Sequence, residues 1–216
     1  MTYIVPPCAE SVDILYADEH LLLVRKPQLL LSVPGRHPDN QDCVINRLRE
    51  AYPGASIVHR LDLDTSGIMV IPLNAATHAH ISRQFQERRV EKSYDAVVFG
   101  RVDGERGEID LPIAPDWSNR PRQKICAERG KAALTRYQVI TREADRSRLL
   151  LKPVTGRSHQ LRLHLASIDH PILGCDLYAH AQALGMAQRL LLHARSLGFT
   201  HPATGQWLEH ECPPEF

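Results

Sequence analysis

A run from His59 to Gly67 brings a histidine, an arginine, two aspartates and two hydroxyl side chains together as His-Arg-Leu-Asp-Leu-Asp-Thr-Ser-Gly. The apolar stretch Ile68-Met69-Val70-Ile71 follows at once, which predicts a charged loop at the start of a buried strand. A carboxylate on such a loop is anchored by the core and open to a cleft, as a nucleophile must be. Asp62 and Asp64 are therefore the first candidates for covalent chemistry.

An ordinary turn is the structural alternative for the same run. Asp62 or Asp64 can cap a turn that Thr65-Ser66-Gly67 closes, and Arg60 can be a surface ion-pair partner. A glycosidase would also use two carboxylates, but such enzymes normally draw them from different segments of the chain. Companion motifs elsewhere in the sequence decide between these interpretations.

The run resembles the HRLDxxTSG signature of the RluA family of RNA pseudouridine synthases at every fixed position. Three more stretches resemble motifs of that family: Lys92-Ser93-Tyr94, the GRxHQ[IL]RxH pattern from Gly156 to His164, and Leu191-Leu192-His193-Ala194. The resemblance extends from about Asp13 to the C-terminus, which favours the family over an isolated turn. Asp64 stands at a free position of the signature, so we expect it only to stabilise the turn.

The resemblance implies a catalytic set made of Asp62, Tyr94 and Arg162. Asp62 is expected to be the nucleophile, and Arg162 the fixed cation that pairs with it and sets its aim. Tyr94 is expected to stack on the uracil, with its hydroxyl where the C5 proton leaves, and Leu161 to supply an apolar wall. Pseudouridylation oxidises nothing and transfers no external group, so we expect no cofactor and no metal.

The resemblance also implies how RNA is held. A stacked uridine must be flipped out of the RNA before it can react, and Arg60 resembles the family arginine that fills the gap. His59 is expected to assist at the same edge, with a purely structural histidine as the alternative.

A basic stripe from Asn119 to Arg136 holds six basic residues against one acidic residue, although the net charge of the chain is only +1. Such a stripe is either a footprint for phosphate contacts or a solvated face. We expect Arg120, Arg122 and Lys124 to grip the RNA backbone and Trp117 to stack on bases.

The expected partners follow from the same resemblance. Length and the loop from Asp116 to Lys124 most resemble the short dual-specificity branch of the family, which modifies a 23S rRNA stem-loop and tRNA anticodon stem-loops. Some relatives carry an N-terminal S4 module, for which we expect no room before the first strand near Asp13. We predict a single catalytic domain over residues 1–216, and a monomer because no coiled coil or large apolar repeat is present. A catalytically inactive RNA-binding module of the same fold is the alternative function.

Hydrophobic periodicity predicts the elements that position these residues. A hairpin is expected from Asp13 to Arg25, a helix from Val44 to Tyr52 capped by Asp42, and a helix capped by Asn74. Later elements include a strand from Tyr94 to Phe99, another from Gly107 to Ile113, a strand pair from Leu134 to Val154, a helix capped by Ser158, and a strand-like C-terminal tail. Strands outnumber helices and are often consecutive, which predicts an α+β fold on a mainly antiparallel mixed sheet flanked by helices and loops.

The composition of the chain argues against a membrane protein, a secreted disulfide-rich protein and a metalloenzyme. The chain of 216 residues has 43% hydrophobic and 24% charged residues, with no run long enough to cross a membrane and no apparent signal peptide. Five scattered cysteines form no C-x-x-C pair, which indicates a reducing cytoplasm. Twelve histidines invite a metalloenzyme interpretation, but His78/His80 and His159/His164 lack HExxH spacing and a third ligand.

Overall fold

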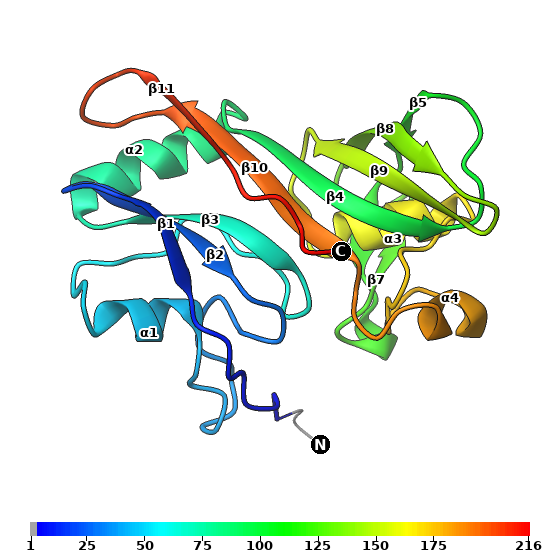
Figure 1. The fold of residues 1–216 in the computed structure, drawn as a ribbon, viewed down its shortest axis with the longest axis horizontal. Coiled ribbons are helices and arrows are strands. Elements are labelled where there is room, and N and C mark those ends of the chain that lie inside the picture. The colour runs from blue at the N-terminus through cyan, green and yellow to red at the C-terminus, as the bar shows by residue number, and fades with distance from the viewer. Residues whose placement is uncertain (1–3) are drawn as a thin grey trace. The chain divides into compact units, whose positions relative to one another are not determined.

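The computed structural model describes residues 4–216, which form two compact units. Unit 1 comprises the chain up to Lys92 together with Ala194–Glu215, and unit 2 comprises Ser93–His193 with Phe216. Two strands, β4 and β10, contribute residues to both units (Figure 1). Each unit combines strands with a few helices, so the predicted α+β class is confirmed.

Unit 1 contains strands in the order β1-β2-β3-β10, with β11 paired to β10. The pairs β1–β2, β2–β3 and β10–β11 are antiparallel, and the predicted N-terminal hairpin is confirmed. The elements are β1 (Asp13–Ala17), β2 (Leu21–Lys26), α1 (Val44–Arg49), β3 (Ser66–Pro72), α2 (Ala75–Gln86), β10 (Leu192–Thr200) and β11 (Trp207–Glu211).

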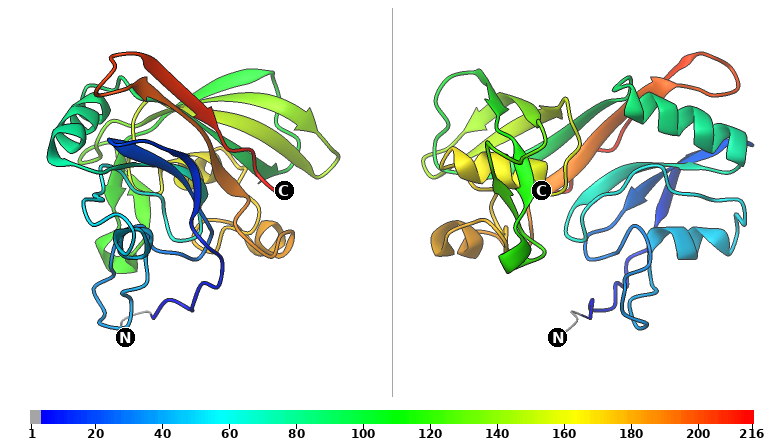
Figure 2. Two further views of the ribbon diagram at one scale, coloured as in Figure 1. Left: turned by 60° about the vertical axis from the view of Figure 1, so that its left-hand side comes forward. Right: turned by 180° about the vertical axis from the view of Figure 1, so that it is seen from behind.

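Strand β3 is the core of unit 1. All seven of its residues are buried, and it pairs with β2 in a register that sets Met69 opposite Val24 and Gly67 opposite Lys26. Helices α1 and α2 lie on opposite sides of β2 and β3, as the view from behind in Figure 2 shows, which explains why both faces of β3 are covered. The predicted buried strand after the charged run is thus confirmed. The charged loop that precedes β3 is therefore attached to a rigid, buried strand.

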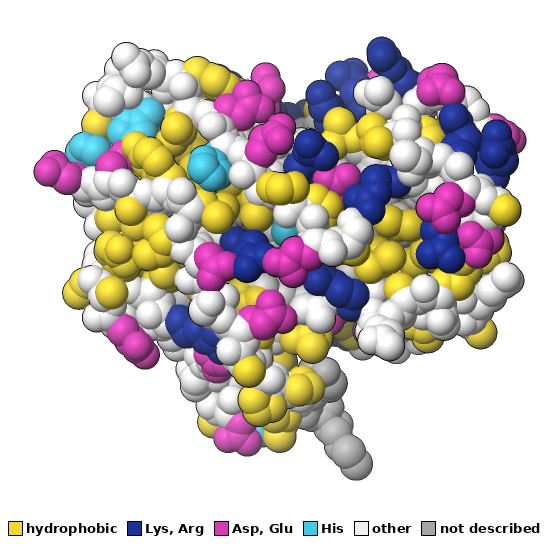
Figure 3. Space-filling model, viewed as in Figure 1, with side chains coloured by type: hydrophobic (Ala, Val, Ile, Leu, Met, Phe, Trp, Pro, Cys, Tyr) yellow, Lys and Arg dark blue, Asp and Glu magenta, His cyan; other side chains and the backbone are white. Residues whose placement is uncertain are grey.

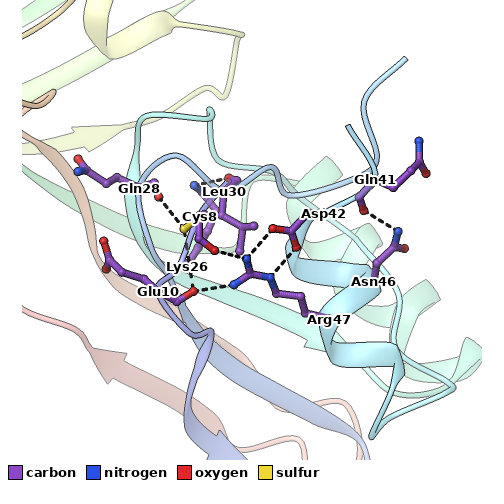
Figure 4. Close-up of polar contacts among 9 residues, drawn as sticks. All are labelled: Cys8, Glu10, Lys26, Gln28, Leu30, Gln41, Asp42, Asn46 and Arg47. Carbon is purple, nitrogen blue, oxygen red and sulfur yellow. Dashed lines mark hydrogen bonds and ion pairs between the residues drawn. The ribbon is translucent and has the colours of Figure 1, made fainter. Parts of the chain in front are cut away.

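The two helix caps expected in unit 1 have different outcomes. Asn74 caps α2 as predicted, because its side chain accepts a hydrogen bond from the Thr77 N–H. The prediction that Asp42 caps α1 is wrong, since Cys43 holds the N-cap position without a side-chain bond. The Asp42 carboxylate instead binds the guanidinium of Arg47 at 2.6 Å (Figure 4). That arginine also donates to backbone carbonyls of the N-terminal segment, and this second role explains why its ion pair outcompetes the cap.

Unit 2 contains an antiparallel sheet in the order β4-β9-β8-β5 and a separate hairpin of β6 and β7. The single strand expected from Gly107 to Ile113 ends at Asp110, and β6 begins at Ile113. The elements are β4 (Glu91–Phe99), β5 (Arg106–Asp110), β6 (Ile113–Pro115), the short 3-10 helix η1 (Trp117–Asn119), β7 (Gln123–Ile125), β8 (Leu134–Arg142), β9 (Arg146–Pro153), α3 (Gln160–Ser167) and α4 (Ala181–Gly185).

Helix α3 packs on one face of this sheet. Leu161 and Leu165 belong to a buried cluster with side chains of β4, β8 and β9, among them Val98 and Leu149. The prediction that Ser158 caps α3 is wrong, because His159 is the N-cap, in a left-handed conformation with φ of 54°, and its side chain makes no cap bond. No helix in the described part of the chain is long and apolar enough to cross a membrane.

Candidate active site

The loop that carries Asp62 is tied down on both sides of that residue. Ser32 Oγ donates to the Leu61 carbonyl at 2.9 Å and accepts from the Leu61 N–H at 3.2 Å. Lys26, which is fully buried, donates from Nζ to the Leu63 carbonyl at 3.0 Å. Asp62 itself is partly buried. Its backbone is therefore fixed while its side chain keeps access to solvent.

The anchor at Lys26 is built from backbone oxygens. Its ammonium also donates to the carbonyls of Pro27 at 2.8 Å and Leu30 at 2.7 Å, the latter drawn in Figure 4. These three carbonyls satisfy the three N–H donors of a lysine, which makes its burial tolerable. The sequence analysis did not single out Lys26, because no local signal links it to Leu63, 37 residues away in the chain.

Gly67 explains why the signature ends in glycine. Its φ is 122°, a conformation that other residues rarely adopt. A Cβ at this position would lie 2.3 Å from the carbonyl oxygen of Ala194. Ala194 closes the Leu191–Ala194 motif, so the close backbone approach joins two of the segments recognised in the sequence.

His59 has a packing role in unit 1. Its Nε2 accepts the N–H of Val70 in β3 at 3.0 Å, and its ring stacks on Phe85 of α2 with 4.8 Å between centroids. Burial, helped by the nearby cation of Lys92, lowers the pKa of His59 to about 3, so the imidazole is neutral at physiological pH. These contacts favour the structural alternative for His59. Its neighbour Arg60 is exposed, as an RNA-contacting arginine should be.

Unit 2 carries the other two members of the expected catalytic set. Tyr94 lies on β4 opposite Leu151 of β9, is partly buried and packs against the core cluster. The Arg162 side chain on α3 is only 2% exposed. Leu161, beside it, is 7% exposed and belongs to the core, so a wall against the uracil stays a prediction for that residue.

Arg162 is held by residues that follow α3 in the sequence. Its Nη2 donates to Asp176 Oδ1 at 2.5 Å, and its Nε donates to Cys175 Sγ at 3.3 Å. The Tyr178 ring lies 5.8 Å from the guanidinium carbon. Sequence reasoning did not single out this segment. Pairing between Arg162 and Asp62, which belong to different units, stays a prediction.

A buried polar network fixes α3 against β8. Gln160 donates from Nε2 to Thr135 Oγ1 at 3.0 Å, and Gln160 Oε1 accepts from the Thr155 hydroxyl at 2.7 Å. His164 Nε2 lies 2.9 Å from the Leu111 carbonyl, and its Nδ1 lies 2.9 Å from Thr135 Oγ1. Since a carbonyl only accepts, Nε2 carries the proton and Nδ1 accepts from the threonine. The glutamine and second histidine of the GRxHQ[IL]RxH motif are thus structural, and they place Arg162 between them.

This network predicts a pH dependence of stability. Burial lowers the pKa of His164 in the folded protein below its unfolded value, so the unfolded chain binds more protons as the pH falls. The stabilisation is fully present above the usual histidine pKa of about 6.5 and is lost below it, by at most about 1.4 kcal/mol per pH unit for this group. In urea unfolding, His164→Gln, which keeps a donor for the Leu111 carbonyl, should show a shallower loss between pH 7 and 5 than wild type. An unchanged slope, with His210→Gln as the control, contradicts the assignment.

The loop between β6 and β7 carries the expected RNA-gripping residues. Trp117 is 70% exposed, and the guanidinium carbon of Arg120 lies 4.1 Å from the centroid of its ring. Arg122 and Lys124 are exposed, and neither forms an ion pair within residues 4–216. The base of the loop is tied to Tyr178, whose hydroxyl accepts the N–H of Gln123 at 2.8 Å.

Basic side chains elsewhere on unit 2 form ion pairs with acidic side chains. Figure 3 shows Lys and Arg interleaved with Asp and Glu over the region of β5, β8 and β9. Arg136 pairs there with Glu108 at 2.7 Å, and Arg142 with Glu105 at 3.0 Å. Such paired charges form a solvated face, so the loop between β6 and β7 is the better phosphate-binding candidate.

The histidines that suggested a metal site bond to protein groups. His78 Nε2 lies 3.2 Å from the Ile57 carbonyl, His80 bonds Gln84, and His159 bonds the Tyr178 hydroxyl at 2.8 Å. Across residues 4–216, no group of three or more His, Cys, Asp or Glu side chains is arranged to hold a metal ion.

Comparison with known proteins places the chain in a family. A family model described as RNA pseudouridylate synthase matches residues 20–167. The chain is 50% identical over 204 residues to the dual-specificity RNA pseudouridine synthase RluA of Yersinia pestis, covering 94% of this chain and 99% of that protein. It is 48% identical over 212 residues to the protein of the same name from Escherichia coli strain K12, covering 98% of this chain and 97% of that one. The solved structure of human RNA Pseudouridylate Synthase Domain Containing 1 superposes with a TM-score of 0.81 at 31% identity, covering 98% of this chain and 86% of that chain. The chain therefore belongs to the RNA pseudouridylate synthase family.

Proposed function

We propose that this protein isomerises uridines in RNA to pseudouridine with Asp62 as the nucleophile. The observation that carries the proposal is the anchoring of Leu61 and Leu63, which fixes the backbone on both sides of Asp62. In the reaction the N1–C1′ bond breaks, the uracil turns and a C5–C1′ bond forms. The proton on C5 leaves and N1 takes one up, so substrate and product have the same composition. Family membership at about 50% identity supports the same activity.

Each catalytic residue has a proposed task in that sequence of bonds. Asp62 attacks or assists at the sugar or base, while Arg162 holds its carboxylate in the ionised form and in a fixed direction. Tyr94 stacks on the uracil and lies near the C5 proton, and Leu161 closes the apolar side of the base.

RNA contacts are assigned to exposed residues of both units. Arg60 occupies the gap left by the flipped uridine, because a planar guanidinium can stack on bases and bind phosphate. Trp117 offers an exposed ring for base stacking, and Arg120, Arg122 and Lys124 bind the backbone. The contacts of His59 leave it the smaller role of positioning Arg60 through the loop.

The substrates we propose are a 23S rRNA stem-loop and a tRNA anticodon stem-loop. The support is the match to relatives named dual-specificity synthases, which extends over 94% and 98% of this chain. We also propose that residues 1–216 act as one catalytic domain, since the family match from 20 to 167 includes residues of both units. A monomer working in the cytoplasm fits the five free cysteines and the RNA substrates.

Incubation of the protein with unmodified 23S rRNA and tRNA transcripts, followed by nucleoside chromatography, tests the proposed function. Pseudouridine in either RNA supports it. Binding of both transcripts without product would favour the inactive RNA-binding module.

Arg122→Ala is expected to weaken RNA binding and flatten its salt dependence. A lost phosphate contact lowers the slope of log K against log salt by roughly 0.7 to 0.9, while the rate at saturating RNA stays at the wild-type level. Arg136→Ala is the matched control, since that arginine is paired with Glu108 in the same unit. Filter binding from 50 to 200 mM salt measures both. Equal slopes for wild type and Arg122→Ala would place the phosphate contacts elsewhere.

A further inference from the structure

The segment from Gly174 to Tyr178 closes around the guanidinium of Arg162. Cys175 is fully buried and offers its sulfur to Nε at 3.3 Å, while Asp176 offers a carboxylate oxygen to Nη2 at 2.5 Å. Tyr178 presents its ring at 5.8 Å. Three residues of one short segment thus lie against the same side chain of α3.

The segment has a fixed backbone. Gly174 has a φ of 69°, and a Cβ there would lie 1.9 Å from the Arg189 carbonyl oxygen. At the other end, the Tyr178 hydroxyl bonds both Gln123 and His159. Asp176 and Cys175 therefore approach Arg162 from a rigid support, as positioning groups must.

The contacts occupy one edge of the guanidinium. An arginine has five N–H donors in a planar fork, and here the Nε and one Nη2 donor on the same edge are committed to Cys175 and Asp176. An arginine that makes these two contacts can also bind other groups through its further N–H donors. The two N–H groups at the end of the fork are the ones that can grip a carboxylate bidentately.

We propose that Asp176, assisted by Cys175, is a positioning residue that sets the direction of Arg162 toward the reacting carboxylate. The inference rests on the proposed function, since it gives Arg162 a catalytic task. Without Asp176 the guanidinium keeps its charge and its burial but loses a charged contact that restricts its rotation. The thiol is a weak acceptor, so the carboxylate does most of the orienting.

An alternative role for Asp176 predicts a change in RNA affinity in place of a change in rate. Its side chain is 62% exposed, and exposed ion pairs contribute little to stability. As a mere surface carboxylate it would only repel RNA phosphates, and its removal would tighten RNA binding without slowing the chemical step. As a positioning residue it acts on the rate at saturating RNA.

The experiment compares Asp176→Asn, Arg162→Lys, Arg162→Met and the double variant Asp176→Asn/Arg162→Lys with wild type, on whichever of the 23S rRNA and tRNA transcripts wild type modifies. Single-turnover rates at saturating RNA and dissociation constants are measured separately. Asp103→Asn is the matched control, because Asp103 is an exposed aspartate of the same unit. We expect Asp176→Asn to lower the rate about tenfold or more with no loss of affinity, Asp103→Asn to match wild type, and the double variant to be no slower than Arg162→Lys.

The outcomes separate the inference from the function on which it rests. A wild-type rate in Asp176→Asn beside an impaired Arg162→Lys overturns the positioning role alone. Additive losses in the double variant also overturn it, since Asp176 would then act through another group. A wild-type rate in Arg162→Lys and Arg162→Met removes the catalytic task of Arg162, and the inference falls with it. Thermal unfolding of each variant checks that a slow rate is not caused by loss of fold.

Discussion

Asp62→Asn is expected to lower pseudouridine formation at least about a thousandfold while leaving RNA affinity within about twofold. The amide has the shape of the carboxylate but is a very poor nucleophile and carries no charge. The contacts that hold the loop go to the backbone of Leu61 and Leu63. They do not depend on the Asp62 side chain, so the loop should keep its conformation.

Single-turnover assays at saturating RNA, read by nucleoside chromatography, measure this effect, and filter binding measures affinity. Asp64→Asn is the matched control, since it makes the same change two residues away in the same loop. It should react at close to the wild-type rate. Substantial turnover by Asp62→Asn, or an equal loss in Asp64→Asn, would remove Asp62 from the nucleophile role.

The second large effect is expected for Arg162→Met, which should lower the rate at saturating RNA by about a hundredfold. Methionine fills much of the buried space but supplies neither the charge nor the donors. Asp176, the partner left behind, is 62% exposed and can be hydrated, so the variant should still fold. Loss of rate then reports on the missing cation at the reacting carboxylate.

Arg162→Lys is the graded comparison for this variant. Lysine keeps the charge but not the planar fork, so its rate should lie between those of wild type and Arg162→Met. Near-ultraviolet circular dichroism tests whether each variant keeps its tertiary packing. A folded Arg162→Met with the wild-type rate would refute the pairing with Asp62.

Local signals in the sequence predicted much of the fold. The apolar run after Gly67 became β3, and Asn74 caps α2, because both signals act within a few residues. The helix caps predicted at Asp42 and Ser158 were wrong for two different reasons. Asp42 binds Arg47, and the left-handed backbone of His159 displaces the expected cap at Ser158. The strands β6 and β7 have three residues each, too few for a periodic pattern to show.

Contacts between distant residues account for what the sequence did not predict in the site. Lys26 reaches Leu63 across 37 positions, and Tyr178 reaches Gln123 across 55. Neither pair has a spacing that marks it. The motif around Arg162 predicted the arginine, but the residues that orient it lie on the segment after α3. Sequence thus indicated the groups that react more readily than the groups that hold them.

Release of tritium from RNA labelled at uridine C5 tests the central claim most directly, because the proton at C5 must leave when the base is rejoined through that carbon. Wild type and Asp62→Asn are compared on a 23S rRNA stem-loop and a tRNA anticodon stem-loop. We predict release by wild type from at least one RNA and none above background by Asp62→Asn. Equal release by both proteins would contradict the role of Asp62, and binding of both RNAs without release by wild type would contradict the proposed isomerisation of these RNAs.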